Sequence, residues 1–214
     1  MVGVQKIPGH LARRFESRPR VARTLAQLQV DSPLILSFAA ACLGVQMFAG
    51  GSRLFAVTKP LDFSLTGATG LFGHVLGHCS WAHLHGNLLL LLIVGPPCET
   101  AFGAPRLSKV MVWTSLASSA SHLVLGPSGG AQKGASGIVF ALILLNSLLQ
   151  RERERVPITF VLTAVLWLQR ELLDPVQGIA HTAHLVGAGV GTFFGCRMHL
   201  RRMWWGGTRR EFAD

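Results

Sequence analysis

The chain has 214 residues, of which 50% are hydrophobic and only 14% are charged, and its mean hydropathy is +0.42. This composition excludes an ordinary soluble protein and is typical of a protein embedded in a lipid bilayer. The formal net charge of +10 would also suit a protein that binds nucleic acid. The basic residues lie beside apolar segments, however, as they do in membrane proteins, so we expect no binding to nucleic acid.

Apolar segments follow one another along the chain, separated by charged residues or by glycine and proline. A helix needs about 20 apolar residues to cross roughly 30 Å of hydrocarbon. The segments predict six transmembrane helices, at 33–49, 81–102, 107–125, 136–149, 156–173 and 178–198. The predicted organisation is a basic cytoplasmic N-terminal segment (1–32), an all-α polytopic transmembrane domain (33–199) and a basic cytoplasmic C-terminal tail (200–214).

The fourth segment is too short to span a bilayer unaided. At 1.5 Å per residue it covers only about 21 Å. Its first residue, Ser136, should therefore lie below the outer surface, within protein or a water-filled pocket.

Lysine and arginine are distributed unevenly between the predicted loops. All but four of the 20 basic residues lie before the first segment, at or beyond the end of the sixth, or in and beside the second-to-third and fourth-to-fifth connections. The exceptions are Arg53, Lys59, Lys133 and Arg170. Because short cytoplasmic loops retain positive charge, we expect both termini in the cytoplasm. The abundance of arginine, alanine and glycine suits a bacterial inner membrane.

Polar side chains gather at the starts of the second, fourth and sixth segments, which all descend from the outer surface in this topology. His83 and Asn87 lie four residues apart, on one face of the second helix. The fourth helix begins at Ser136, and the sixth carries His181 and His184. Polar residues buried in a membrane tend to face the bundle interior and to mark function.

These residues are the types that nucleophilic catalysis requires: a serine within reach of a neutral imidazole, and donors for the oxyanion. We expect Ser136 to be the nucleophile and His184 the general base, because burial disfavours the charged imidazolium. His83, Asn87 and the Ser136 backbone N–H would stabilise the tetrahedral intermediate. Phe140, one turn below Ser136 on the same face, would support the imidazole in place of a triad aspartate. A Ser/His dyad is therefore expected.

Glycines accompany both halves of this dyad. Gly134 and Gly137 flank the serine, and a glycine recurs at every fourth position after His184, beginning with Gly187. Such small residues let two helices approach closely in a membrane. The repeat would therefore draw the imidazole towards the serine.

At this point the chain resembles the rhomboid intramembrane serine proteases, over roughly residues 70–196. The matching pieces are His78-Cys79-Ser80-Trp81-Ala82-His83, Asn87, Gly95 with Glu99, Gly134-Ala135-Ser136-Gly137, and His184-Leu185-Val186-Gly187. The resemblance implies a six-helix rhomboid-like bundle, with Ser136 and His184 as the dyad and His83 and Asn87 flanking the oxyanion. The family's Trp-Arg pair in the first loop would fall at Thr69-Gly70 and is missing here.

The resemblance also implies the reaction: hydrolysis of peptide bonds in or near the transmembrane segments of other membrane proteins, with no cofactor and no metal. The partners would be those substrates and the lipid bilayer. Two alternatives stay open, a non-catalytic rhomboid-like protein that binds transmembrane clients and a membrane metalloenzyme. The imidazole ligands available to the metalloenzyme are His74, His78, His83, His85, His181 and His184.

Overall fold

The structure is a computed structural model that describes residues 30–49, 53–61, 63–148 and 181–206, together with positions 158, 161, 162, 165 and 166. By its contacts the chain divides into two compact units, Met1–Asp31 and Ser32–Asp214. The helices and strands of the described residues all belong to the second unit. Almost all of the predicted basic segment 1–32, and most of the fifth predicted span, lie outside the described residues.

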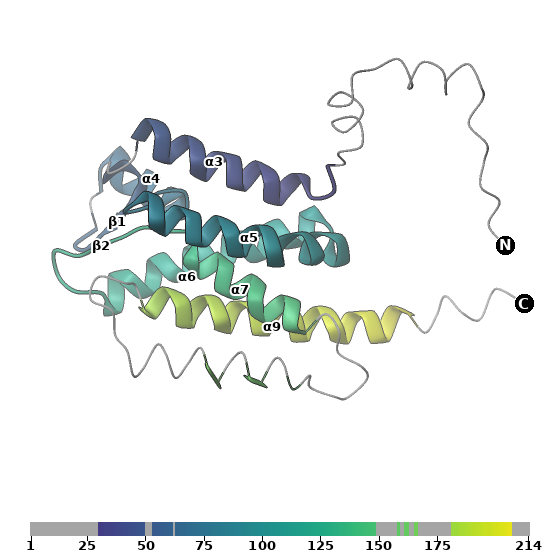
Figure 1. Ribbon diagram of the computed structural model, residues 1–214. Helices are drawn as coiled ribbons and strands as arrows, with labels where there is room; N and C mark the ends of the chain where they lie inside the picture. The colour runs from purple at the N-terminus through teal and green to yellow at the C-terminus, as the bar shows by residue number, and fades with distance from the viewer. Residues whose placement is uncertain are drawn as a thin grey trace, which may run out of the picture. The chain divides into compact units, whose positions relative to one another are not determined.

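The described part of the chain is mostly helical (Figure 1). Its helices are α3 (Pro33–Ala49), α4 (Leu65–Gly73), α5 (Trp81–Phe102), α6 (Ala104–Leu125), α7 (Ser136–Ser147) and α9 (His181–Gly206). Between them lie a 3-10 turn, η1 (Arg53–Phe55), and the two-residue strands β1 (Val57–Thr58) and β2 (Ala131–Gln132). The predicted all-α class is therefore confirmed, apart from this small sheet.

The larger helices lie where the apolar segments predicted them. The bounds of α3 and α5 are those expected, whereas α6 begins earlier, at Ala104, and α9 continues to Gly206. In the part of the chain that the structure describes, no helix has both the length and the apolar composition of a membrane span. The count of six spans is thus not confirmed, and placement in a bilayer stays a prediction.

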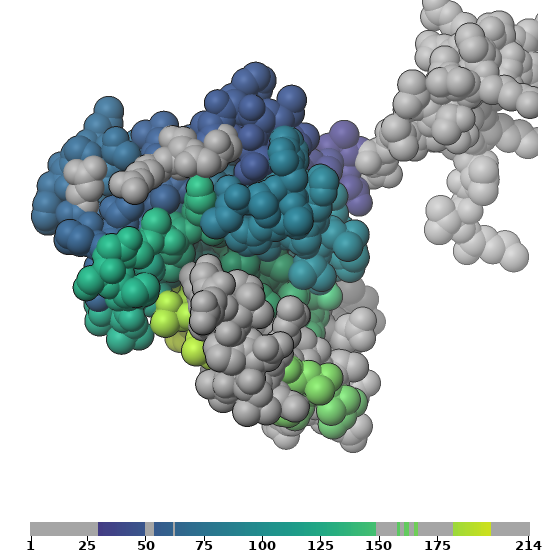
Figure 2. All heavy atoms as spheres, turned by 60° about the vertical axis from the view of Figure 1, so that its left-hand side comes forward, coloured from purple at the N-terminus to yellow at the C-terminus, as the bar shows by residue number. Residues whose placement is uncertain are grey.

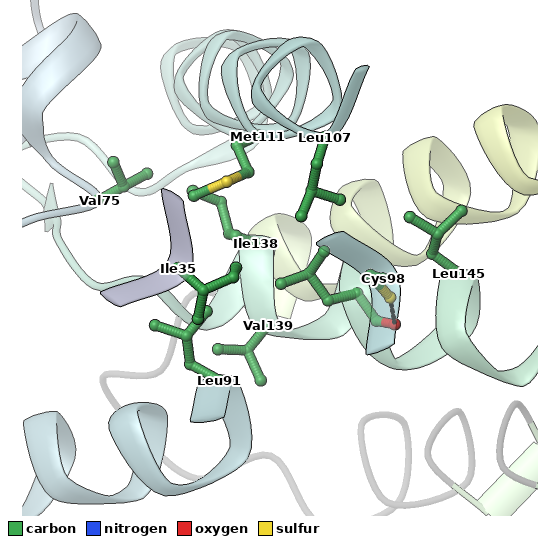
Figure 3. Close-up of a cluster of buried hydrophobic side chains, with 10 residues drawn as sticks. Ile35, Val75, Leu91, Cys98, Leu107, Met111, Ile138, Val139 and Leu145 are labelled. Atoms are coloured by element: carbon green, nitrogen blue, oxygen red, sulfur yellow. Dashed lines mark hydrogen bonds between the residues drawn. The ribbon is translucent and has the colours of Figure 1, made fainter. Parts of the chain in front are cut away.

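Helix α7 occupies the centre of the bundle, where it packs against α5, α6 and α9. Seven of its twelve residues are buried and none is exposed: Gly137, Ile138, Val139, Ala141, Leu142, Leu144 and Leu145 are buried. The face that carries Ser136 and Phe140 is half-buried. A helix with so little exposed surface is one that other elements surround. Figure 3 shows this core, to which α3 contributes Ile35, α5 contributes Leu91 and α6 contributes Leu107. Ser136, the first residue of α7, therefore extends from the most firmly packed element of the bundle.

The loop between α3 and α5 is joined to the loop that precedes α7. Strands β1 and β2 pair antiparallel, with Val57 opposite Gln132, and the Lys59 backbone N–H donates to the carbonyl oxygen of Gly130 at 3.1 Å. The ammonium of Lys59 donates to the carbonyl oxygens of Val124 and Gly126 at 2.8 and 2.9 Å. A cation suits this end of α6, where the helix dipole is negative. Figure 2 shows the contact between the two loops, with the first loop in blue above the second in green.

The first loop also packs closely at the position where the family's Trp-Arg pair would fall. Gly70 of α4 lies so near β1 that an added β-carbon would overlap the carbonyl oxygen of Ala56. The neighbouring hydroxyl of Thr69 donates to the carbonyl oxygen of Leu54 at 3.1 Å. A large side chain at position 70 has no room in this arrangement.

The N-terminus of α3 is capped by a carboxylate from another helix. The Glu99 side chain of α5 accepts hydrogen bonds from the backbone N–H groups of Leu34 and Ile35 at 3.0 and 2.9 Å. The first N–H groups of a helix have no partner within it, and a negative charge there is favoured by the helix dipole. Gly95, one turn earlier, makes room for Ile35, whose Cδ1 would lie 2.8 Å from an added β-carbon. The Gly95 and Glu99 pair thus joins α3 to α5.

Replacement of Glu99 is expected to destabilise the fold, more strongly by alanine than by glutamine. Glu99→Ala leaves both N–H groups of α3 buried without an acceptor and should lower the free energy of unfolding by about 3 kcal/mol. Glu99→Gln keeps one acceptor oxygen and should lose roughly half as much. Thermal unfolding of the purified variants in detergent measures the order. Equal stability of the wild type and Glu99→Ala would contradict the capping role.

Candidate active site

Ser136 is the first residue of α7. The turn before it is held by hydrogen bonds from the backbone N–H groups of the two preceding residues. The backbone N–H of Gly134 donates to the carbonyl oxygen of His74 at 2.9 Å. The N–H of Ala135 donates to Nε2 of His78 at 3.4 Å. Gly134 has a φ of 136°, a backbone conformation that favours glycine. The serine is half-buried, so its hydroxyl lies at the edge of the core rather than on the open surface.

His184 lies in the first turn of α9 and is buried. The centroid of its imidazole is 4.6 Å from that of the Phe140 ring, with 46° between the two planes. Phe140 is one helical turn after Ser136 and shares its face of α7. The imidazole is therefore placed over the face of α7 that carries the serine.

A close crossing of α7 and α9 produces this placement. A β-carbon at Gly187 would overlap the carbonyl oxygen of Gly137, and one at Gly137 would lie 3.1 Å from the carbonyl oxygen of Ala183. The two backbones touch because neither glycine carries a side chain. His184 lies between Ala183 and Gly187 in the chain, so the crossing fixes its distance from the start of α7.

The second pair of predicted residues lies on the other side of the serine turn. The ring of His83 lies against Gly134, with its Cε1 2.8 Å from the place of an added β-carbon, and Nδ2 of Asn87 is 3.9 Å from the same place. The α5 N-terminus that carries them is capped by Ser80, whose hydroxyl accepts from the His83 N–H at 3.1 Å. His83 and Asn87 thus face the residue two positions before Ser136.

The side-chain amide of Asn87 is buried beside the serine turn. Its Nδ2 has no hydrogen-bond partner among the residues that the structure describes. A buried polar group left unpaired costs about 1–3 kcal/mol, so such a group calls for a reason. Its place beside the serine turn makes it available to a ligand atom that accepts a hydrogen bond.

Two histidines of the first loop, His74 and His78, contact the serine turn, although no pattern in the sequence indicated a positioning role for either. His78 accepts from Ala135, as described, and its ring meets the His83 ring edge to face at a centroid distance of 5.1 Å and an interplanar angle of 71°. His74 holds Gly134 through its backbone carbonyl, while its Nδ1 lies 3.2 Å from the hydroxyl of Ser119 on α6. Contacts made by a loop residue have no helical spacing that could reveal them.

The remaining predicted residues are placed as follows. His181 is the first residue of α9, but its side chain lies outside the described part of the structure. Within the described residues, no three His, Cys, Asp or Glu side chains lie close enough together to hold a metal ion. The histidines proposed as ligands for a metalloenzyme therefore do not form a metal site among these residues.

Lower pH is expected to destabilise the protein through the two loop histidines. The pKa of His74 is lowered from 6.5 to about 4, mainly by burial and in smaller part by electrostatic repulsion from the nearby His122. Burial, followed by the charges of His83 and Lys133, lowers the pKa of His78 from 6.5 to about 4. Between pH 4 and 6.5 the unfolded chain therefore binds more protons than the folded one, and stability falls as the pH falls through this window.

The size of this effect follows from the number of protons. Each histidine contributes up to about 1.4 kcal/mol per pH unit within the window. Unfolding of the wild type should be followed from pH 7 to pH 4 beside His74→Gln, which removes one titrating group and should show a shallower decline. The same slope in both proteins would show that His74 is not responsible.

Comparison with known proteins identifies the family to which the chain belongs. The sequence model of the family described as Rhomboid domain matches residues 66–201. The chain is similar to Rhomboid-related protein 1 of Caenorhabditis elegans, with 26% identity over 132 residues that cover 55% of this chain and 36% of the relative. The chain thus spans about a third of that relative's length. The family match covers more than half of the chain, including the first turns of α5, α7 and α9 that form the candidate site, and the chain therefore belongs to the rhomboid family.

Proposed function

We propose that the protein is an intramembrane serine endopeptidase, which hydrolyses peptide bonds in or near the transmembrane segments of other membrane proteins. The observation that carries the proposal is the crossing of α7 and α9. It sets the His184 imidazole against Phe140, one turn below Ser136, while the unpaired amide of Asn87 faces the serine turn from α5. These contacts support a site in which three helices supply the nucleophile, the base and an oxyanion donor.

The proposed mechanism begins with transfer of the Ser136 hydroxyl proton to the His184 imidazole as Oγ attacks the carbonyl carbon of the substrate. The carbonyl oxygen becomes an oxyanion, which the amide of Asn87, the ring of His83 and the backbone N–H of Ser136 would stabilise. The imidazolium then gives its proton to the leaving amine. Water then attacks the acyl carbon and gives a proton to the imidazole. The imidazolium returns that proton to Ser136 Oγ as the bond between Oγ and the acyl carbon breaks.

The contact between Phe140 and His184 suits this mechanism. The Phe140 ring packs against the buried imidazole at a centroid distance of 4.6 Å. The ring also limits the orientations of the imidazole, as the aspartate of a catalytic triad does in other serine proteases. We therefore assign Phe140 the supporting role, with Gly134, Gly137 and Gly187 as the residues that allow the close approach.

We also propose that the bundle lies in a membrane, as six spans with both termini in the cytoplasm. Large apolar side chains face outward on two of its helices: Leu89, Leu90, Leu92 and Ile93 on α5, and Val112, Trp113, Val124 and Leu125 on α6. Exposed apolar surface of this extent marks contact with lipid or with another protein. A bacterial inner membrane suits the sequence, and a substrate helix would reach the site from within the same bilayer.

The experiment is cleavage of single-span reporter proteins by the purified protein in liposomes. Ser136→Ala and His184→Ala should each lower the rate by about 10⁴-fold or more, as removal of a catalytic residue does in other serine proteases. Ser147→Ala is the matched control: it lies at the end of the same helix, where its hydroxyl donates to the carbonyl oxygen of Ile143 at 2.9 Å. Its rate should stay within about twofold of the wild type. Cleavage that survives Ser136→Ala would reject the mechanism, and binding of reporters without cleavage would favour the non-catalytic client-binding alternative.

A further inference from the structure

His78 is buried deeply in a loop that connects three parts of the candidate site. Its side chain is 1% exposed, although it lies outside the regular helices. Nε2 accepts from the backbone N–H of Ala135 at 3.4 Å, and Nδ1 lies 3.2 Å from the carbonyl oxygen of Leu76. The ring packs against that of His83. One imidazole thus contacts its own loop, the serine turn and a residue of the oxyanion site.

These contacts are compatible with a single form of the ring. A nitrogen that accepts from Ala135 carries no proton, so the proton of a neutral imidazole must be on Nδ1, where it is donated to Leu76. The opposite tautomer would set an N–H against the N–H of Ala135 and a lone pair against a carbonyl oxygen. The imidazolium carries a proton on Nε2 and would therefore also set an N–H against the N–H of Ala135. Burial favours the neutral ring, so both contacts hold together and fix the orientation of the side chain.

The fixed His78 ring determines where the peptide before Ser136 lies relative to the His83 ring. Through Ala135 it holds the peptide that immediately precedes Ser136. Through its edge-to-face contact it limits the orientation of His83, whose ring lies against Gly134. Geometric control of donors within a fraction of an ångström is what electrostatic stabilisation of an oxyanion requires.

We propose that His78 is a positioning residue for the reaction: it holds the serine turn and the His83 ring in register, so that the oxyanion site is assembled before substrate binds. This inference rests on the proposed endopeptidase function. His78 touches neither the substrate nor the reacting atoms, and its effect is transmitted through Ala135 and His83. Its loss therefore lowers kcat and leaves KM almost unchanged, because the affected interactions are those of the transition state.

The test compares His78→Leu, His78→Gln and a matched control in the liposome cleavage assay, with kcat, KM and thermal unfolding measured for each. His78→Leu removes the acceptor and should lower kcat by about 100-fold, comparable to loss of one oxyanion donor. His78→Gln places a side-chain carbonyl near Nε2 and should recover kcat to within about tenfold of the wild type. The control is His122→Leu. His122 is a buried histidine of α6, and its Nε2 lies 3.4 Å from the carbonyl oxygen of Gly130, in the loop that precedes α7. It should lower the unfolding temperature as His78→Leu does, yet leave kcat within about threefold.

The outcomes distinguish failure of the positioning role of His78 from failure of the proposed endopeptidase function. Cleavage that depends on Ser136, with the same kcat in His78→Leu as in His122→Leu, would overturn the positioning role alone. The same conclusion would follow if His78→Gln were as slow as His78→Leu, because restoration of the acceptor would then be without effect. Cleavage that does not depend on Ser136 would overturn the proposed function and the inference together.

Discussion

Replacement of Gly187 with alanine is expected to lower proteolytic activity by at least about 100-fold. The added methyl group would overlap the carbonyl oxygen of Gly137 and lie 2.9 and 3.1 Å from that residue's carbonyl carbon and Cα. All three atoms belong to the backbone of α7, so no side chain can rotate away. The two helices must separate close to the contact between Phe140 and the His184 imidazole, where the proposed dyad lies. His184 lies one turn before Gly187, and a shift of about 1 Å between reacting groups is enough for this loss.

Gly189→Ala is the control for this experiment. Gly189 lies on the same helix two residues later, and a β-carbon there would meet nothing within 4 Å. Alanine is a better helix former than glycine, so this variant should be as active as the wild type and slightly more stable. Rates of reporter cleavage at saturating substrate measure both variants. Full activity of Gly187→Ala would mean that the α7–α9 crossing does not set the geometry of the site.

The positions of the main helices could be predicted from the sequence because apolar runs and their punctuation carry that information. Gly103, with a φ of 78°, ends α5, and Pro105 lies in the first turn of α6, a position that proline favours. The start of this helix was predicted too late, at residue 107, because the prediction used hydrophobicity and the first turn of α6 contains the charged Arg106. The end of α9 at Gly206 was missed for the same reason: helical hydrogen bonding continues into a basic segment that hydropathy does not recognise.

The candidate site was predictable only in part. Helical spacing places Phe140 below Ser136, and the small residues after His184 indicate a close crossing, so the contact between Phe140 and the imidazole could be anticipated from the sequence. The pairing of β1 with β2, the Lys59 contacts with α6 and the bond from Ala135 to His78 could not. These contacts join loops distant in the chain, and no periodic pattern encodes them.

The packing of the first loop gives a further lesson about the missing Trp-Arg pair. From the sequence alone, its absence at Thr69-Gly70 left the placement of the loop open. In the structure this loop is held by the close approach of Gly70 to Ala56, by the β1–β2 pairing and by the side-chain hydrogen bonds of Lys59. The turn before Ser136 is thus anchored without the pair, through His74 and His78.

Gly134→Ala is expected to lower activity by about 100-fold or more, for two separable reasons. The φ of 136° at this position is one that residues with a side chain rarely adopt, at a strain of about 1–3 kcal/mol. A methyl group would also lie 2.8 Å from Cε1 and 3.1 Å from Nε2 of His83. The imidazole would have to move from its place beside the serine turn, and loss of one oxyanion donor lowers rates by about 100- to 1000-fold.

Gly129→Ala separates backbone strain from displacement of His83. Gly129 lies in the same loop with a φ of 77°, and a β-carbon there would meet nothing within 4 Å. It should therefore lose stability to a similar extent as Gly134→Ala while keeping most of its kcat. Thermal unfolding and reporter cleavage of both variants measure the two effects side by side. If the two variants lost equal activity at equal loss of stability, strain in the loop alone would account for the result, and the contact between Gly134 and His83 would have no catalytic consequence.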